Sequence, residues 1–186
     1  IEIAGITRAY PIKILNWHEI VNDRIGREAF SITYCPLCGT GMAFSARLKN
    51  KKLDFGVSGL LYNSDVLLYD RQTDSLWSQI LQQAVTGELK GSLLTRIPLM
   101  HTTWGDWKQL HPETKVLSTR TGAVRNYETD PYKGYDKSQH LFFPVYSKAP
   151  GKYHPKERVL GVEINGVFKA YPFIELNKNG KALFED

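Results

Sequence analysis

The sequence contains only two cysteines among its 186 residues. This number excludes a structural metal site built from four cysteines of one chain. A site of two cysteines and two histidines is not indicated either, because none of the five histidines is followed by another at the short spacing typical of such sites. The chain also lacks an apolar run of about 18 to 20 residues, the length that a membrane-spanning helix requires.

Three further functions lack their sequence signals. The glycines in residues 55–65 do not have the spacing of a dinucleotide-binding or Walker loop. Residues 56–59 are one residue shorter than the Gly-x-Ser-x-Gly turn of serine hydrolases. The formal net charge of +5 is spread along the chain, and its densest basic cluster, residues 49–52, has no stacking aromatics beside it. We therefore expect no nucleic-acid partner.

The two cysteines form a C-x-x-C motif at Cys35 and Cys38. Gly39 and Gly41 follow almost at once, and the alternating segment after them predicts a strand, a tight turn and a second strand. A redox site of the thioredoxin type would place the pair at a helix N-terminus instead. The motif can form a structural disulfide, exchange electrons with another disulfide, or bind a soft metal ion. All three interpretations are open at this point.

Several polar residues are candidates for the surroundings of the sulfurs. His18 lies on a predicted helix and is a possible metal ligand, whereas Arg71 can stabilise a thiolate by its charge. Ser64 and Gln79 could line the same cleft as Asp70. The alternatives are structural: a turn cap for Asp70, an ion pair for Arg71, and a helix-to-loop hydrogen bond for His18. The predicted site residues are Cys35, Cys38, Arg71 and Asp70 for catalysis, and Cys35, Cys38 and His18 for a metal.

The pattern of apolar residues predicts a single α+β domain over residues 1–186 that is predominantly β, with antiparallel hairpins and a few short helices. Helices are predicted over residues 11–22 and 103–110, the second with Thr103 as its N-cap. Residues 125–157 read as a long loop held in place by six aromatic residues. The predicted strands cover residues 29–34, 41–48, 52–58, 66–69, 76–78 and 84–87.

An internal repeat links the two ends of the sequence. Residues 1–16 align without gaps with residues 162–177, and the copies share Glu, Ile, Gly, Ala, Tyr, Pro, Leu and Asn at equivalent positions. Each copy predicts a strand, a tight turn, a second strand and a short helix opened by proline. The similarity resumes after a gap, where residues 180–184 resemble residues 26–30. The repeat suggests that the termini pack side by side, or that two related halves build one sheet system.

The motifs together resemble the bacterial and archaeal domain of unknown function 3179, over nearly the whole chain. Members of that family are typically exported or membrane-anchored, so the resemblance implies an extracytoplasmic location and a possible membrane anchor outside this fragment. The first residue, Ile1, is not a methionine, which leads us to expect that an N-terminal segment has been removed. The resemblance rests on residues 16–23, 34–39, 55–59, 63–65, 69–73, 75–79, 107, 111–112, 116–118, 131–132 and 134–135.

The leading hypothesis is an extracytoplasmic thiol protein that exchanges electrons with a partner's disulfide. In this scheme Cys35 attacks, Cys38 resolves the mixed disulfide, and Arg71 or His18 stabilises the thiolate. The alternatives are a protein that binds or delivers a soft metal such as Cu(I) or Zn, and an interaction domain whose cysteines form a structural disulfide. The partner, a protein or a small molecule, is not identified by the sequence.

Overall fold

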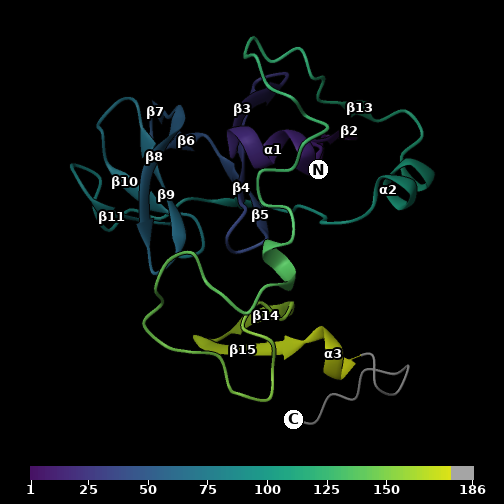
Figure 1. Ribbon diagram of the computed structural model, residues 1–186. Helices are drawn as coiled ribbons and strands as arrows, with labels where there is room; N and C mark the ends of the chain where they lie inside the picture. The colour runs from purple at the N-terminus through teal and green to yellow at the C-terminus, as the bar shows by residue number, and fades with distance from the viewer. Residues whose placement is uncertain (177–186) are drawn as a thin grey trace. The chain divides into compact units, whose positions relative to one another are not determined.

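The computed structural model describes residues 1–176, and within it the chain divides into two compact units (Figure 1). The first runs from Ile1 to Tyr135 and the second begins at Asp136. The predominantly β, α+β fold class predicted from the sequence is confirmed. The prediction of one domain over the full length stays a prediction.

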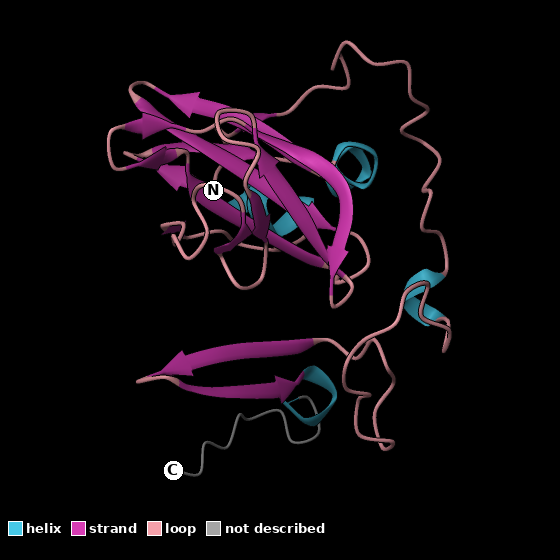
Figure 2. Cartoon of the chain, turned by 90° about the vertical axis from the view of Figure 1, so that its left-hand side faces the viewer, coloured by secondary structure: helices cyan, strands magenta, loops and turns pink. Residues whose placement is uncertain are grey.

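Two four-stranded sheets form the main body of the first unit, seen from the side in Figure 2. Their orders are β12-β5-β4-β3 and β11-β10-β9-β8, and all pairings within them are antiparallel. The strands of the first sheet are β3 Ile20–Ile25, β4 Glu28–Cys35, β5 Thr40–Ser45 and β12 Arg96–Ile97. Those of the second are β8 Phe55–Tyr62, β9 Asp65–Asp70, β10 Leu76–Ser78 and β11 Gln83–Thr86.

Smaller elements surround these sheets. The hairpin β1-β2 is extended by β13, which pairs in parallel with β2, and β6 pairs with β7. Among the described helices, none is long and apolar enough to cross a membrane. The remaining elements of the first unit are β1 Glu2–Ile3, β2 Ile6–Ala9, α1 Ile12–His18, β6 Arg47–Leu48, β7 Lys51–Lys52, α2 Trp104–Leu110 and β13 Lys115–Val116.

Strand β4 separates two hydrophobic clusters because its side chains alternate between the faces of its sheet. Phe30, Ile32 and Tyr34 pack on one face with residues of β3, β5 and α1. Cys35 faces the other side and packs with Phe55 and other buried residues of the second sheet. The two sheets therefore bury one core between them, and a second core covers the outer face of the first sheet.

Polar contacts join the sheets at the side of β4 that carries Cys35. Thr33 is fully buried, and its hydroxyl accepts a hydrogen bond of 2.9 Å from the side-chain amide of Gln79. Asn22 on β3 bonds both backbone groups of Phe55, through Nδ2 at 2.8 Å and Oδ1 at 3.0 Å. Ser31, also fully buried, donates to the same Oδ1 at 2.7 Å. These bonds fix the alignment of the sheets, since each buried polar group would lose its partner if they shifted.

The second unit contains the hairpin of β14 Val159–Ile164 and β15 Val167–Pro172, followed by α3 Phe173–Leu176. A short 3-10 helix at Tyr135–Lys137 spans the boundary between the two units.

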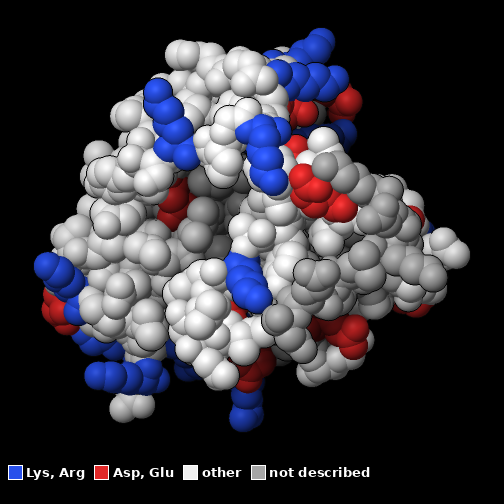
Figure 3. All heavy atoms as spheres, turned by 90° about the horizontal axis from the view of Figure 1, so that it is seen from below, with Lys and Arg blue, Asp and Glu red and all other residues white. Residues whose placement is uncertain are grey.

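On the face shown in Figure 3, Lys and Arg side chains are scattered, and several lie beside Asp or Glu. The absence of a nucleic-acid partner stays a prediction.

The internal repeat has the same local structure in both copies. Each gives two paired strands and a helix, with Ile3 opposite Ile6 in the first hairpin and Ile164 opposite Val167 in the second. Both turns have two residues at positive φ, as the predicted Asn-Gly turn requires: 49° and 75° at residues 4–5, and 52° and 77° at residues 165–166. Residue 177 and the later match at residues 180–184 lie outside the described residues.

Most predicted elements are present, with one correction. The predicted helix over residues 11–22 is wrong at its end, because Glu19 adopts a left-handed φ of 57° as C-cap and Ile20 begins β3. Of the aromatic residues in the long loop, Tyr127 and Tyr135 are buried, whereas Tyr146 is 80% exposed. The second helix begins after its N-cap Thr103, whose side chain accepts from the backbone N–H of Asp106, as predicted.

Replacing Asn22 by alanine tests the contacts between the sheets. The Asn22→Ala variant removes three hydrogen bonds and leaves both backbone groups of the buried Phe55 without these partners. We expect the free energy of unfolding to fall by about 1 to 3 kcal/mol in urea titrations. Arg24→Ala, at another exposed position of the same strand, is the matched control. Equal losses in the two variants would contradict the role given to Asn22.

Candidate functional site

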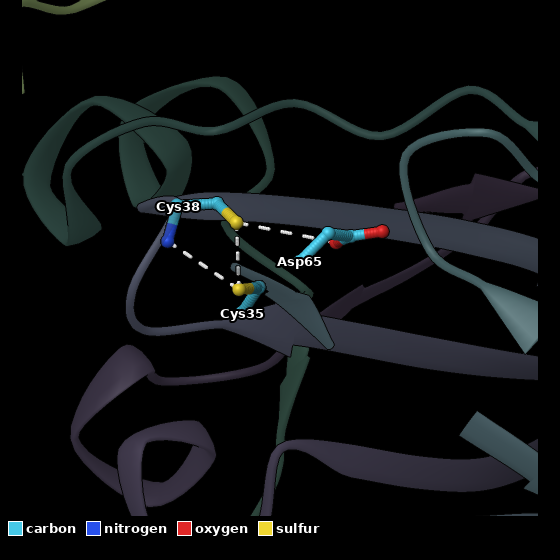
Figure 4. A group of neighbouring side chains, drawn as sticks. All are labelled: Cys35, Cys38 and Asp65. Atoms are coloured by element: carbon cyan, nitrogen blue, oxygen red, sulfur yellow. Dashed lines mark hydrogen bonds between the residues drawn. The ribbon is translucent and has the colours of Figure 1, made fainter. Parts of the chain in front are cut away.

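The cysteines lie in the tight turn between β4 and β5, as the strand–turn–strand prediction requires. Cys35 is the last residue of β4 and pairs with Thr40, the first residue of β5. Gly39 completes the turn with a φ of 60°, a conformation that glycine adopts without strain. This turn places Cys38 above the end of the strand and turns its sulfur back toward Cys35 (Figure 4).

A second turn, from the other sheet, meets the cysteine turn. Asn63 and Ser64 both have positive φ, 53° and 63°, and they connect β8 to β9. The carbonyl oxygen of Ser64 lies 3.4 Å from the sulfur of Cys38 and 3.9 Å from that of Cys35. Asp65, the first residue of β9, adds its carboxylate to the same group. The site is thus formed by one hairpin from each sheet.

The two sulfurs and the carboxylate form a compact set of donor atoms. The Sγ atoms of the free thiols Cys35 and Cys38 are 2.8 Å apart, and Oδ1 of Asp65 lies 3.9 Å from Sγ of Cys38. One ligand atom from each residue lies within 4.8 Å of the others. Cys35 is 1% exposed, Asp65 is also buried, and Cys38 is half-buried. This arrangement can hold a metal ion, or it can close to a disulfide.

The surroundings of the two sulfurs differ in charge. The contact with the thiol of Cys38, the backbone N–H of Cys38 at 3.3 Å and the N–H of Val66 lower the pKa of Cys35, whereas burial and the charge of Asp65 act in the opposite direction. Cys38 faces acceptors instead: the thiolate of Cys35, burial and the charge of Asp65 raise its pKa far above the usual range. The surroundings therefore lower the pKa of Cys35 and raise that of Cys38, so Cys38 is the sulfur that retains its proton.

Asp65 is held in place by the strand and turn that follow it in the second sheet. Its Oδ2 accepts from the hydroxyl of Ser78 at 2.6 Å and from the backbone N–H of Ile80 at 3.1 Å. Burial raises the pKa of this carboxyl, and these hydrogen bonds act in the opposite direction. Its other oxygen, Oδ1, is directed toward Cys38 (Figure 4).

His18, predicted as a metal ligand, is bonded elsewhere. Its Nε2 lies 2.6 Å from the hydroxyl of Tyr127, in a segment that runs along α1. Lys13, Asn16 and Trp17 on the same helix also bond to residues 128–130 of that segment. Burial and the charge of Arg125 lower the pKa of His18. This is the helix-to-loop contact considered as the alternative for His18, and its role as a ligand stays a prediction.

Asp70 and Arg71 lie in different surroundings, one inside the core and the other at the surface. Asp70 is fully buried and accepts from the indole N–H of Trp77 at 2.9 Å and from the backbone and hydroxyl of Thr73. Arg71 is exposed and donates to the hydroxyl of Tyr69 at 2.7 Å. Neither has a described contact with a cysteine, so the structure does not join them to the sulfurs. Their predicted catalytic roles are untested.

The group that the sequence did not assign to the site is Asp65. The sequence shows that Asp65 directly follows an Asn-Ser turn. It does not show that this turn lies against the cysteine turn, because that depends on contacts between the two sheets. Ser64, expected to line the cleft, contributes its carbonyl oxygen.

Tyr132 also lies near the sulfurs: burial raises the pKa of its phenol, and the charges of Glu19 and Cys35 add to that effect.

The fold and site define a strand-rich protein in which two sheets bring a cysteine pair against a carboxylate. The chain belongs to the family described as "Protein of unknown function (DUF3179)", which matches residues 1–185. The family resemblance predicted from the sequence is thereby confirmed. Comparisons with curated proteins and with solved structures give no match.

The Asp65→Asn variant tests the charge at the site. Because the carboxylate raises the pKa of both thiols, its removal lowers those pKa values and increases the thiolate fraction at a given pH. We expect faster alkylation of Cys38 by iodoacetamide near pH 8, by about a factor of ten for each unit of pKa lowered. Peptide mass spectrometry gives the rate for each cysteine. Asp54→Asn, at an exposed surface ion pair with Lys52, is the control. Unchanged rates in Asp65→Asn would refute the charge effect.

Proposed function

We propose that the protein binds a metal ion through Cys35, Cys38 and Asp65, with Zn(II) as the best-fitting ion, in an extracytoplasmic compartment. The observation that carries this proposal is the set of three ligand atoms within 4.8 Å of one another. The extracytoplasmic location comes from the family resemblance alone.

The charge distribution around the sulfurs supports a cation. Two thiols, the carboxylate of Asp65 and the carbonyl of Ser64 all present electron-rich atoms to one small volume. In the part of the chain that the structure describes, no Lys, Arg or His side chain has a hydrogen bond or ion pair with the two thiols or with the carboxylate of Asp65. A bound metal ion would balance this negative charge, and it would replace the proton that Cys38 otherwise retains.

The geometry favours zinc over Cu(I). Tetrahedral zinc with Zn–S bonds of about 2.3 Å needs its sulfurs about 3.8 Å apart, so the pair would open by about 1 Å. A linear two-sulfur Cu(I) site would need a wider separation of the same sulfurs. The carboxylate of Asp65 is also a ligand typical of zinc and less suited to the soft Cu(I) ion.

A second candidate function is dithiol–disulfide exchange, the leading hypothesis from the sequence. The separation of 2.8 Å between the sulfurs favours it, because closing a disulfide needs little movement. In such a reaction one thiolate attacks a partner's disulfide and releases a partner thiolate. The other cysteine then displaces the second partner thiol, so two electrons and two protons pass to the partner. The half-buried sulfur, Cys38, is the one that a partner can reach, yet it is the one that retains its proton.

Metal titration of the reduced protein tests the proposal. We expect one Zn(II) per chain, and we expect Cys35→Ser, Cys38→Ser and Asp65→Ala each to weaken binding by at least about tenfold. Competition with a chromophoric chelator measures the affinity. His18→Ala is the matched control and should bind zinc like the wild type, because His18 contacts Tyr127.

The same titration separates the two candidate functions. Reduced wild-type protein that retains no zinc would contradict the metal site. A reversible disulfide with a reduction potential above about −300 mV would then favour exchange, because inert structural disulfides lie below that value.

A further inference from the structure

Gln79 is fully buried, and one of its polar atoms has no partner among the described residues. The side-chain nitrogen donates to the hydroxyl of Thr33 at 2.9 Å and to the carbonyl of Thr40 at 3.1 Å. The side-chain oxygen, Oε1, has no hydrogen-bond partner. A buried amide oxygen without a donor costs free energy, and such groups in folded proteins normally bond to a ligand or an ordered water.

Gln79 contacts both hairpins that carry the proposed metal ligands. Thr33 lies two residues before Cys35, so both side chains project from the same face of β4. Thr40 is the residue that pairs with Cys35 across the hairpin. On the other sheet, the backbone N–H of Gln79 donates to Val66, the residue after Asp65. The amide of Gln79 is therefore enclosed by the strands that carry the ligands.

The proposed site has three protein ligands, one fewer than a structural zinc site. Zinc sites with a purely structural role have four protein ligands, whereas three protein ligands with an exchangeable fourth are typical of sites that bind water or substrate. The compact group here has three members, Cys35, Cys38 and Asp65. A water molecule in the fourth position would have two O–H groups to donate. Oε1 of Gln79 is a hydrogen-bond acceptor that has no donor among the described residues.

We propose, on the basis of the metal-binding function above, that the site keeps an exchangeable coordination position whose resident ligand is water, held by a hydrogen bond to Oε1 of Gln79. Small metal ligands can replace this water at the same coordination position, including anions such as thiocyanate. The metal site is then of the reactive type, able to bind and polarise a small substrate, and not a structural cross-link. Gln79 acts as a positioning residue for the exchangeable ligand.

Cobalt substitution tests the exchangeable position directly. Co(II) bound by two thiolates gives charge-transfer and visible bands that respond to a change of ligand. Thiocyanate titrated into the reduced Co(II) protein should shift the visible bands with a saturating, single-site dependence. If no Co(II) binds, the proposed metal function fails. If Co(II) binds but thiocyanate leaves the spectrum unchanged, the open position is refuted while metal binding stands, as it would if the carbonyl of Ser64 completed the site.

Variants of Gln79 test its role in holding the water. In Gln79→Leu the water loses its acceptor, so thiocyanate should displace it more readily and bind about two- to tenfold more tightly. Gln79→Met provides a second apolar replacement of similar length in case the leucine variant does not fold. Thr33→Val is the matched control, because it removes a hydrogen bond to the amide but leaves Oε1 in place. Equal thiocyanate affinity in wild type and both Gln79 variants, or an equal gain in Thr33→Val, would overturn the assignment.

Discussion

The alternation of side chains along β4 is the constraint on which the structure depends. Its even-numbered residues, from Phe30 to Tyr34, are apolar and pack in the outer core, whereas Ser31 and Thr33 are polar, fully buried and directed at the second sheet. A shift of one residue would place Ile32 or Tyr34 where Thr33 meets Gln79, and the amide of Gln79 would lose its hydrogen bond to Thr33. The pairing of the two sheets therefore has one alignment that satisfies its buried polar groups.

The same alignment builds the site. Cys35 and Cys38 lie at the end of one hairpin, and Ser64 and Asp65 lie at the end of another that belongs to the opposite sheet. Neither hairpin alone holds the sulfurs and the carboxylate together. A metal ion bound to all three would connect the sheets and would stabilise the folded state in proportion to its affinity, since the unfolded chain does not bring these residues together.

Local features of this fold could be predicted from the sequence, and contacts between distant segments could not. The strand–turn–strand around Cys35 and the two hairpins of the repeat depend on alternation and on turn residues, which neighbouring positions determine. The helix end at Glu19 was missed because a left-handed glutamate is a rare stop signal. Asp65 was not assigned to the site because its meeting with Cys38 requires the two sheets to pack. Asp70 and Arg71 are adjacent in sequence, yet Asp70 ends β9 inside the core and Arg71 begins the exposed turn that follows.

The division of charge between the sulfurs bears on which chemistry the site performs. An efficient exchanger needs one sulfur that is both ionised and accessible to a partner's disulfide. Here the donors around Cys35 lower the pKa of the sulfur that is 1% exposed, whereas the acceptors around Cys38 raise the pKa of the sulfur that is half-buried, so the sulfur that a partner can reach retains its proton. A metal ion would have no such requirement, because it would enter between the sulfurs and displace the remaining proton. The asymmetry that hinders attack on a bulky disulfide is therefore an argument for the proposed metal site.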